Sequence, residues 1–127
     1  MPCTMGPRQV VLPADTTAPR AARKFLAEAC CGSHVAEVVE EAQLLVSELV
    51  TNAVRYGAPP IELQVCCAGE DQLHIRVRDS DPGTPQPRDA DADAEGGRGL
   101  LLVDVVSDDW GHEDDADGKA VWFTLKV

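Results

Sequence analysis

Basic residues and long apolar runs are both scarce in this chain of 127 residues. Its 11 Lys and Arg stand against 22 Asp and Glu, which gives a formal net charge of −11. Because nucleic-acid affinity depends on neutralising phosphates with Lys and Arg, this balance argues against a direct nucleic-acid partner. No stretch approaches the ~18 uninterrupted apolar residues of a membrane-spanning helix, and no signal-peptide core follows the N-terminus. We therefore expect a cytoplasmic protein without membrane contact.

Metal-binding spacings are absent as well. The five cysteines include two adjacent pairs but no Cys-x-x-Cys, and the three histidines form no His-x-x-x-His pair. These spacings argue against a zinc site and against a disulfide framework. The acidic run at 89–95 lacks the glycine and distal glutamate of an EF-hand loop. We expect this run, and the second group of acidic residues near the end (Asp108, Asp109, Glu113, Asp114, Asp115 and Asp117), to lie in solvated loops.

The patterns that are present predict one α+β domain covering residues 1–127, with 44% hydrophobic residues. Apolar residues at helical spacing predict a helix from Ala18 to Cys30 and a longer one from Val35 to Tyr56, ended by Gly57. Expected strands are 9–12, 61–67, 73–78, 109–112 and 119–126, and a short helix is expected at 100–106. Because the strands come in hairpins, we predict a two-layer sandwich, with a mixed, mainly antiparallel sheet and helices on one face.

Two segments are expected outside this framework. Residues 1–8 should be disordered, and residues 80–98 contain Pro and Gly breaks without hydrophobic periodicity. A loop of that length inside a compact domain is usually functional or disordered.

Two polar residues interrupt the longest predicted helix. Glu48 and Asn52 lie at positions i and i+4, on one face that also carries Leu45 and Tyr56. A carboxylate and an amide on a half-buried helix face can polarise a water and hold a divalent cation through oxygen ligands. The alternative is an ordinary Glu–Asn surface pair.

Two further features suit a nucleotide. Asp79 follows a strand and can accept a hydrogen bond from an amino group such as that of adenine, although a turn-forming Asp is the alternative. The run Gly96–Gly99 precedes a helix, where backbone N–H groups and the helix dipole favour an anion. Arg98 adds a charge suited to phosphate. The run is not a Walker A motif, and a flexible hinge is its alternative reading.

These features, in this order, resemble the boxes of the Bergerat-fold (GHKL) ATPases. Residues 48–57 look like the N-box, Asp79–Gly83 like the G1 box, and Gly97–Leu100 like the G2 box. Trp110-Gly111 and Gly118–Phe123 are similar to the ends of the small bacterial anti-sigma-factor serine kinases, including their actinobacterial members. The resemblance spans nearly the whole chain.

The resemblance implies a role for each matching residue. Glu48 would be the general base, and Asn52 would ligate Mg²⁺. Asp79 would bind the adenine amine. The other implied ATP contacts are Gly83 at the adenine pocket, Gly97, Arg98, Gly99 and Leu100 around the phosphates, and Thr124 at adenine through a water. Residues 80–98 would be the ATP lid.

The implied function is an ATP- and Mg²⁺-dependent serine/threonine protein kinase that acts as an anti-sigma factor. It would bind a sigma factor, phosphorylate an anti-sigma antagonist, and form a homodimer. We expect neither a complete histidine kinase nor a gyrase-like motor, since no phosphoacceptor-histidine helix precedes the domain and no transducer domain follows it.

One departure keeps an alternative open. The G1 box usually reads Asp-x-Gly-x-Gly, whereas Asp81 and Pro82 stand here where the family has Gly and any residue. A side chain at Asp81 would narrow the adenine pocket and place a negative charge near phosphates. The first alternative is therefore a non-catalytic module that sequesters a protein partner, with or without ATP. The second is a small acidic domain that binds no nucleotide and uses the glycine run as a hinge.

Overall fold

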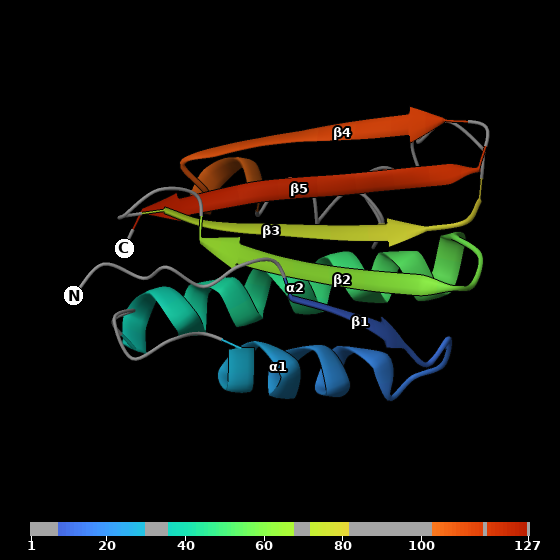
Figure 1. The fold of residues 1–127 in the computed structure, drawn as a ribbon, viewed down its shortest axis with the longest axis horizontal. Coiled ribbons are helices and arrows are strands. Elements are labelled where there is room, and N and C mark those ends of the chain that lie inside the picture. The colour runs from blue at the N-terminus through green and yellow to red at the C-terminus, as the bar shows by residue number, and fades with distance from the viewer. Residues whose placement is uncertain (1–7, 30–35, 68–71, 82–102, 116, 127) are drawn as a thin grey trace.

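The structure, a computed structural model, describes residues 8–29, 36–67, 72–81, 103–115 and 117–126. In this part of the chain a five-stranded sheet is covered by helices on one face (Figure 1). The elements are β1 (Arg8–Leu12), α1 (Ala18–Ala29), α2 (Ala36–Tyr56), β2 (Ile61–Cys67), β3 (Gln72–Asp79), β4 (Asp109–Asp115) and β5 (Gly118–Lys126). Residues 103–106 are also helical, inside the helix expected at 100–106.

The strand order is β1-β2-β3-β5-β4. β5 lies between β3 and β4, so β1 and β4 are the two edges of the sheet. Each neighbouring pair of described strands is antiparallel. This arrangement confirms the predicted α+β fold with helices on one face, and the described strands include no parallel pair of the kind that a mixed sheet contains.

Helix α2 packs the helical layer against the sheet. Its buried side chains recur every three or four residues, as the sequence pattern predicted, and they contact β2, β3 and β5. The buried ones are Val38, Ala42, Leu45, Val46, Leu49, Val50 and Ala53. The neighbouring helix α1 is tied to α2 by hydrogen bonds from the Arg23 guanidinium to the Ser47 hydroxyl (3.0 Å) and from the Gln43 amide to the Arg23 carbonyl (3.0 Å).

The alternation of side chains along β3 separates the two faces of the sheet. Leu73, Ile75, Val77 and Asp79 are buried on the helix side, and the residues between them are half-exposed on the helix-free side. Phe123 of β5, opposite Ile75, is completely buried in the same core. Asp79 thus ends a row of apolar core residues, and it is the only carboxylate in that row.

β4 is longer than the sequence analysis expected. Glu113 and Asp114, assigned to a solvated loop, continue the strand that was expected to end at His112. The pattern misled because β4 is an edge strand whose acidic side chains are exposed to water, so it lacks the apolar alternation of a half-buried strand. β1 likewise starts at Arg8, which was assigned to the disordered N-terminal segment and which pairs with Val65.

Candidate functional site

Asp79 is buried at the end of β3, with 5% of its surface exposed. Its Oδ1 accepts a hydrogen bond from the backbone N–H of Asp81 at 2.8 Å. The next residue, Ser80, donates its backbone N–H to the carbonyl of Ala58 at 2.8 Å, which ties the end of β3 to the segment that follows α2. The carboxyl group therefore has a fixed position under the C-terminal end of α2.

Two glycines lie against Asp79, one directly after α2 and one at the start of β5. A Cβ atom at Gly57 would lie 2.5 Å from Cγ of Asp79 and 2.7 Å from the carbonyl oxygen of Ala53, and a Cβ atom at Gly118 would overlap the carbonyl oxygen of Asp79. Both positions require glycine because of this close approach. The sequence analysis used Gly57 as a helix stop and as the last residue of the N-box, but it named neither glycine as a site residue.

Burial has the largest influence on the pKa of Asp79. It raises the pKa of the Asp79 carboxyl, because desolvation disfavours the charged form. Hydrogen bonds from the backbone N–H groups of Asp81 and Ala58 and the positive charge of Lys119 act in the opposite direction, while the charge of Asp81 adds to the effect of burial. A carboxylate has about four lone-pair positions, so these two N–H donors leave acceptor capacity for an amino group.

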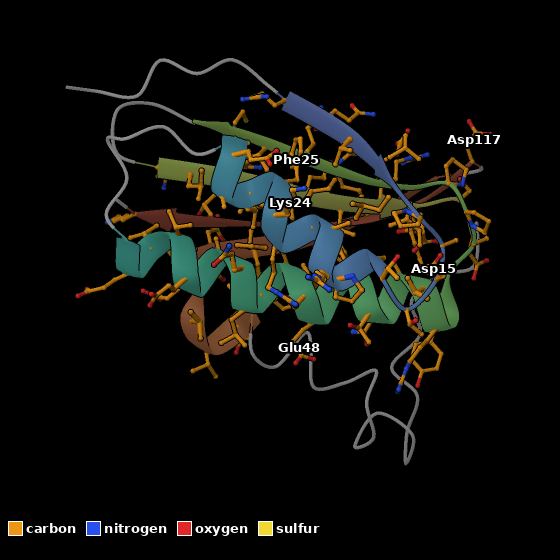
Figure 2. All side chains as sticks on the ribbon, turned by 90° about the horizontal axis from the view of Figure 1, so that it is seen from below. Asp15, Lys24, Phe25, Glu48 and Asp117 are labelled. Atoms are coloured by element: carbon orange, nitrogen blue, oxygen red, sulfur yellow. The ribbon has the colours of Figure 1, made fainter. Side chains whose placement is uncertain are left out.

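Glu48 and Asn52 are both half-buried on α2, in agreement with the interrupted pattern seen in the sequence. Figure 2 shows Glu48 projecting outward from this helix. At about 1.5 Å of rise per residue, Asn52 lies about 7 Å and Glu48 about 14 Å along the helix from Gly57, which contacts Asp79. Asn52 and Glu48 therefore form a row of polar groups along α2, and Asp79 of β3 lies against Gly57, the residue that follows this helix.

Thr124 is not brought to Asp79. The β3–β5 register places Thr124 opposite His74, whereas Lys119 is opposite Asp79. Thr124 alternates with the core residues Phe123 and Leu125, so its side chain lies on the helix-free face, and Asp79 contacts α2 on the other face. The expected contact of Thr124 with an adenine held by Asp79 is therefore inconsistent with this register. The alternation of Val121, Phe123 and Leu125 in the sequence also places Thr124 on the opposite face of this strand, whereas its contact with adenine was implied by the family resemblance.

The remaining expected ATP contacts, Gly83, Gly97, Arg98, Gly99 and Leu100, lie outside the described residues, as does most of the expected lid. Within the described residues no group of three or more His, Cys, Asp or Glu could hold a metal ion. Mg²⁺ usually keeps several waters and is bound through few protein ligands together with substrate phosphates. The single amide oxygen of Asn52 fits a cation that is bound in this way.

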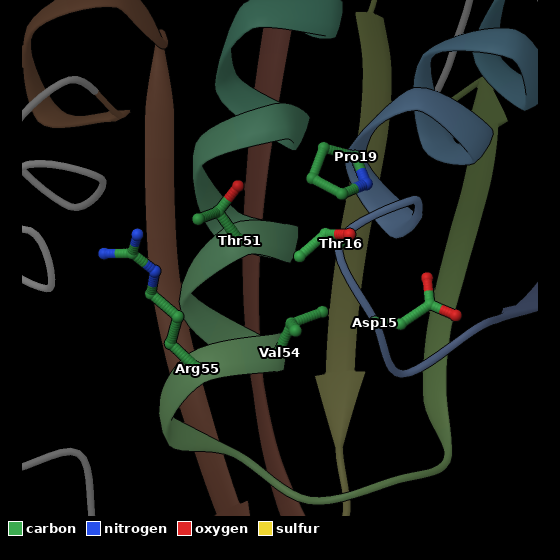
Figure 3. A pocket seen from close by; sticks show the side chains of 6 residues that line it. All are labelled: Asp15, Thr16, Pro19, Thr51, Val54 and Arg55. Atoms are coloured by element: carbon green, nitrogen blue, oxygen red, sulfur yellow. The ribbon is translucent and has the colours of Figure 1, made fainter.

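A separate cavity of about 160 Å³ lies between α2 and the loop before α1 (Figure 3). It is lined by Asp15, Thr16, Pro19, Thr51, Val54 and Arg55. Thr51 and Arg55 come three and seven residues after Glu48 on α2, but neither Asp79 nor Gly57 reaches this cavity. It therefore adjoins the row of polar groups without forming part of it.

The sheet with helices on one face has the architecture of the Bergerat (GHKL) fold. Residues 12–125 match the family model of the histidine kinase-like ATPase domain. The chain belongs to this family.

Two solved structures show the same fold. A crystal structure of the RsbU and RsbW domains of a Mycobacterium tuberculosis protein superimposes with a TM-score of 0.71 and 21% identity, covering 94% of this chain and 32% of that one. The histidine kinase domain of the blue-light activated histidine kinase EL346 from Erythrobacter litoralis gives 0.53 and 23%, covering 70% and 44%. This chain thus matches less than half the length of either structure. No curated protein matches the sequence at a significant level.

The described helices also differ from membrane-spanning helices. None of them combines the length and the hydropathy needed to cross a bilayer.

Proposed function

We propose that this protein is a regulatory serine/threonine kinase that binds ATP with Mg²⁺ in the cytoplasm and acts as an anti-sigma factor, phosphorylating an anti-sigma antagonist. Membership of the histidine kinase-like ATPase family supports the nucleotide. The likeness of fold to a structure that includes an RsbW domain, together with the motifs of the sequence, supports the regulatory role. The proposed partners are a sigma factor, its antagonist protein and a second copy of the chain.

The observation that carries this proposal is the row of polar groups along α2. Asp79 is buried and held by backbone N–H groups at one end, and the half-buried Asn52 and Glu48 follow at increasing distance. A carboxylate that keeps acceptor capacity suits the amino group of a base. An amide oxygen and a second carboxylate further along suit a cation and a proton transfer.

The roles of the chain's own residues follow from their chemistry. Asp79 accepts a hydrogen bond from the amino group of adenine and so fixes the base at the end of β3. Asn52 offers its amide oxygen to the cation. Glu48 accepts the proton of the incoming serine or threonine hydroxyl. ATP, when bound with Mg²⁺, supplies the phosphoryl group, and positioning and charge neutralisation account for most of the rate in such transfers.

A second candidate function is sequestration of a protein partner without catalysis. The aspartate at position 81 favours it, because its carboxylate lies two residues from Asp79 and adds negative charge beside the proposed adenine position. The two candidates agree on the fold and differ in whether phosphate is transferred.

Thermal and chemical unfolding with and without Mg-ATP tests the nucleotide site first. A ligand that binds only the folded state should raise the free energy of unfolding by about 2.7 kcal/mol at a hundredfold excess over Kd. We expect this stabilisation in the wild type, a requirement for Mg²⁺, and its loss in Asn52→Ala. Gln64→Ala, which removes an amide from β2, is the matched control and should respond like the wild type.

No stabilisation of the wild type at millimolar Mg-ATP would contradict the proposal. Transfer of labelled phosphate to a candidate antagonist then separates the two functions. Transfer supports the kinase. Stable binding of the partner with bound ATP but no transfer supports sequestration.

A further inference from the structure

Asp81 is held immediately beside the proposed adenine-binding carboxylate. Its backbone N–H donates to Oδ1 of Asp79 at 2.8 Å, so residues 79–81 form a tight turn in which the two acidic residues face the same small region. Asp81 disfavours the charged form of Asp79. The Asp81 carboxylate would therefore oppose nucleotide binding, both by adding negative charge beside an anionic ligand and by disfavouring the ionised Asp79 that accepts the amino group, unless a positive charge offset it.

Lys119 supplies a positive charge at this place. The β3–β5 register puts it directly opposite Asp79, and its Nζ lies 3.5 Å from Oδ2 of Asp81. The side chain of Lys119 is 17% exposed and that of Asp81 is 36% exposed. Lys119 is therefore mostly shielded from water while Asp81 remains partly exposed, so their attraction is screened somewhat less than that of a fully exposed pair. Lys119 also acts on Asp79 in the direction that favours the ionised form.

We propose that Lys119 is a positioning residue that determines nucleotide affinity. It neutralises the charge of Asp81 and holds the turn at residues 79–81 in place, and so keeps Asp79 in position. This inference rests on the proposed function, in which Asp79 binds the adenine amine. It explains how an aspartate can occupy a position beside the base, since the chain carries the compensating charge on the neighbouring strand. Neither Lys119 nor its contact with Asp81 was identified from the sequence.

The proposal predicts a specific pattern of affinities. Lys119→Met should weaken Mg-ATP binding about five- to tenfold, because the uncompensated Asp81 carboxylate then adds negative charge beside the nucleotide and disfavours the ionised acceptor Asp79. Asp81→Asn in the same chain should restore most of that loss, since it removes the charge that Lys119 neutralises. Asp81→Asn alone should bind at least as well as the wild type, and Lys119→Arg, which keeps the charge, should stay close to it.

A purely structural ion pair would behave differently. Its loss would lower the melting temperature of the free protein, and Asp81→Asn would lower it as well, without restoring affinity to Lys119→Met. Lys126→Met is the matched control, because Lys126 is exposed on the same strand and its removal changes the net charge by the same amount. Its affinity for Mg-ATP should equal that of the wild type.

The test is titration calorimetry of the full chain with Mg-ATP for these variants, together with their melting temperatures without nucleotide. Suppose that the wild type binds Mg-ATP. Equal affinity of Lys119→Met and the wild type, or no recovery of affinity in Lys119→Met/Asp81→Asn, would then overturn this inference and leave the proposed function standing. Absence of Mg-ATP binding to the wild type would overturn both. If Lys119→Met does not fold, Lys119→Gln replaces it in the same comparison with the same expected loss and recovery.

Discussion

The two ends of the candidate site are built in different ways. The Asp79 end is assembled from β3, the end of α2 and the start of β5, and it is enclosed by two glycines and by backbone hydrogen bonds. The Glu48 end stands on a single helix, with half-exposed side chains. A position fixed by three elements is ready to bind before a ligand arrives, whereas groups on one helix need other parts of the chain or a partner to complete them.

Because of this difference, substitutions at the two ends of the candidate site should impair different properties of the protein. Changes at Asp79 should affect binding and stability together, because the same contacts carry both. Changes at Glu48 should affect transfer with little effect on either.

Replacing Glu48 should have the largest effect. Glu48→Gln removes the proposed proton acceptor and should lower the rate of phosphotransfer about 10²- to 10⁴-fold, while the Kd for Mg-ATP changes little. Single-turnover transfer to the antagonist and calorimetry measure the two quantities. Glu40→Gln, at an exposed position of the same helix, is the control and should retain transfer. Full activity in Glu48→Gln would remove Glu48 from the role of general base.

The next effect concerns the affinity for the base. Asp79→Asn replaces a charged acceptor, and since hydrogen bonds to charged groups contribute about 1.5–3 kcal/mol, Mg-ATP binding should weaken about ten- to a hundredfold. Asp114→Asn removes an exposed charge from β4 and should bind like the wild type. Equal affinities of Asp79→Asn and the wild type would show that Asp79 does not contact the nucleotide.

The two faces of the sheet can be compared with a matched pair of glycines. Gly57→Ala would place a Cβ against the Asp79 carboxyl, and Gly111→Ala would place one 2.8 Å from the Trp122 ring on the helix-free face. Each should lower the free energy of unfolding by about 1–3 kcal/mol, as overpacking does. Only Gly57→Ala should also weaken Mg-ATP binding. Denaturant unfolding and calorimetry test this pair, and equal affinities in the two variants would refute the prediction.

The smallest effect is a dependence of stability on pH. Because the pKa of Asp79 is raised in the folded state, the native protein binds this proton more tightly than the unfolded chain. We therefore expect the wild type to gain stability relative to Asp79→Asn as the pH falls through the pKa of Asp79 in the folded state. This gain in the free energy of unfolding should be complete below the pKa of Asp79 in the unfolded chain. Denaturant midpoints across acidic pH measure it, and a difference that falls with decreasing pH would contradict this sign.

The sequence predicted the elements of the fold well where side chains meet the core in a regular pattern. The periodic run that became α2 ends at Tyr56 as expected, and the hairpin of β2 and β3 was predicted within two residues. These predictions depend on local spacing alone. The acidic end of β4 was missed, because an edge strand in water does not need apolar alternation.

Contacts between distant parts of the chain could not be predicted from the pattern. The closure of Gly57 and Gly118 around Asp79, and the pairing of Lys119 with Asp81, depend on the register of β3 with β5. Thr124 is a different case, because its contact with adenine was implied by the family resemblance, while the alternation of Val121, Phe123 and Leu125 places it on the other face of the strand. Glu48, Asn52 and Asp79 could be chosen because polar residues interrupt apolar elements there, and their roles stay proposals.

The acidic end of β4 also distinguishes the two borders of the sheet. Unpaired strand edges offer a template for association with further chains, and like charges at such an edge oppose it. Asp114 places an exposed negative charge on the β4 border, where Glu113 is paired with Arg76 at 3.1 Å, whereas the β1 border carries no acidic residue and exposes 60% of Val11. Two copies that met border to border through β4 would repel each other. Growth of the sheet into larger aggregates would therefore start from β1, and a charged residue in place of Val11 would make the protein more soluble.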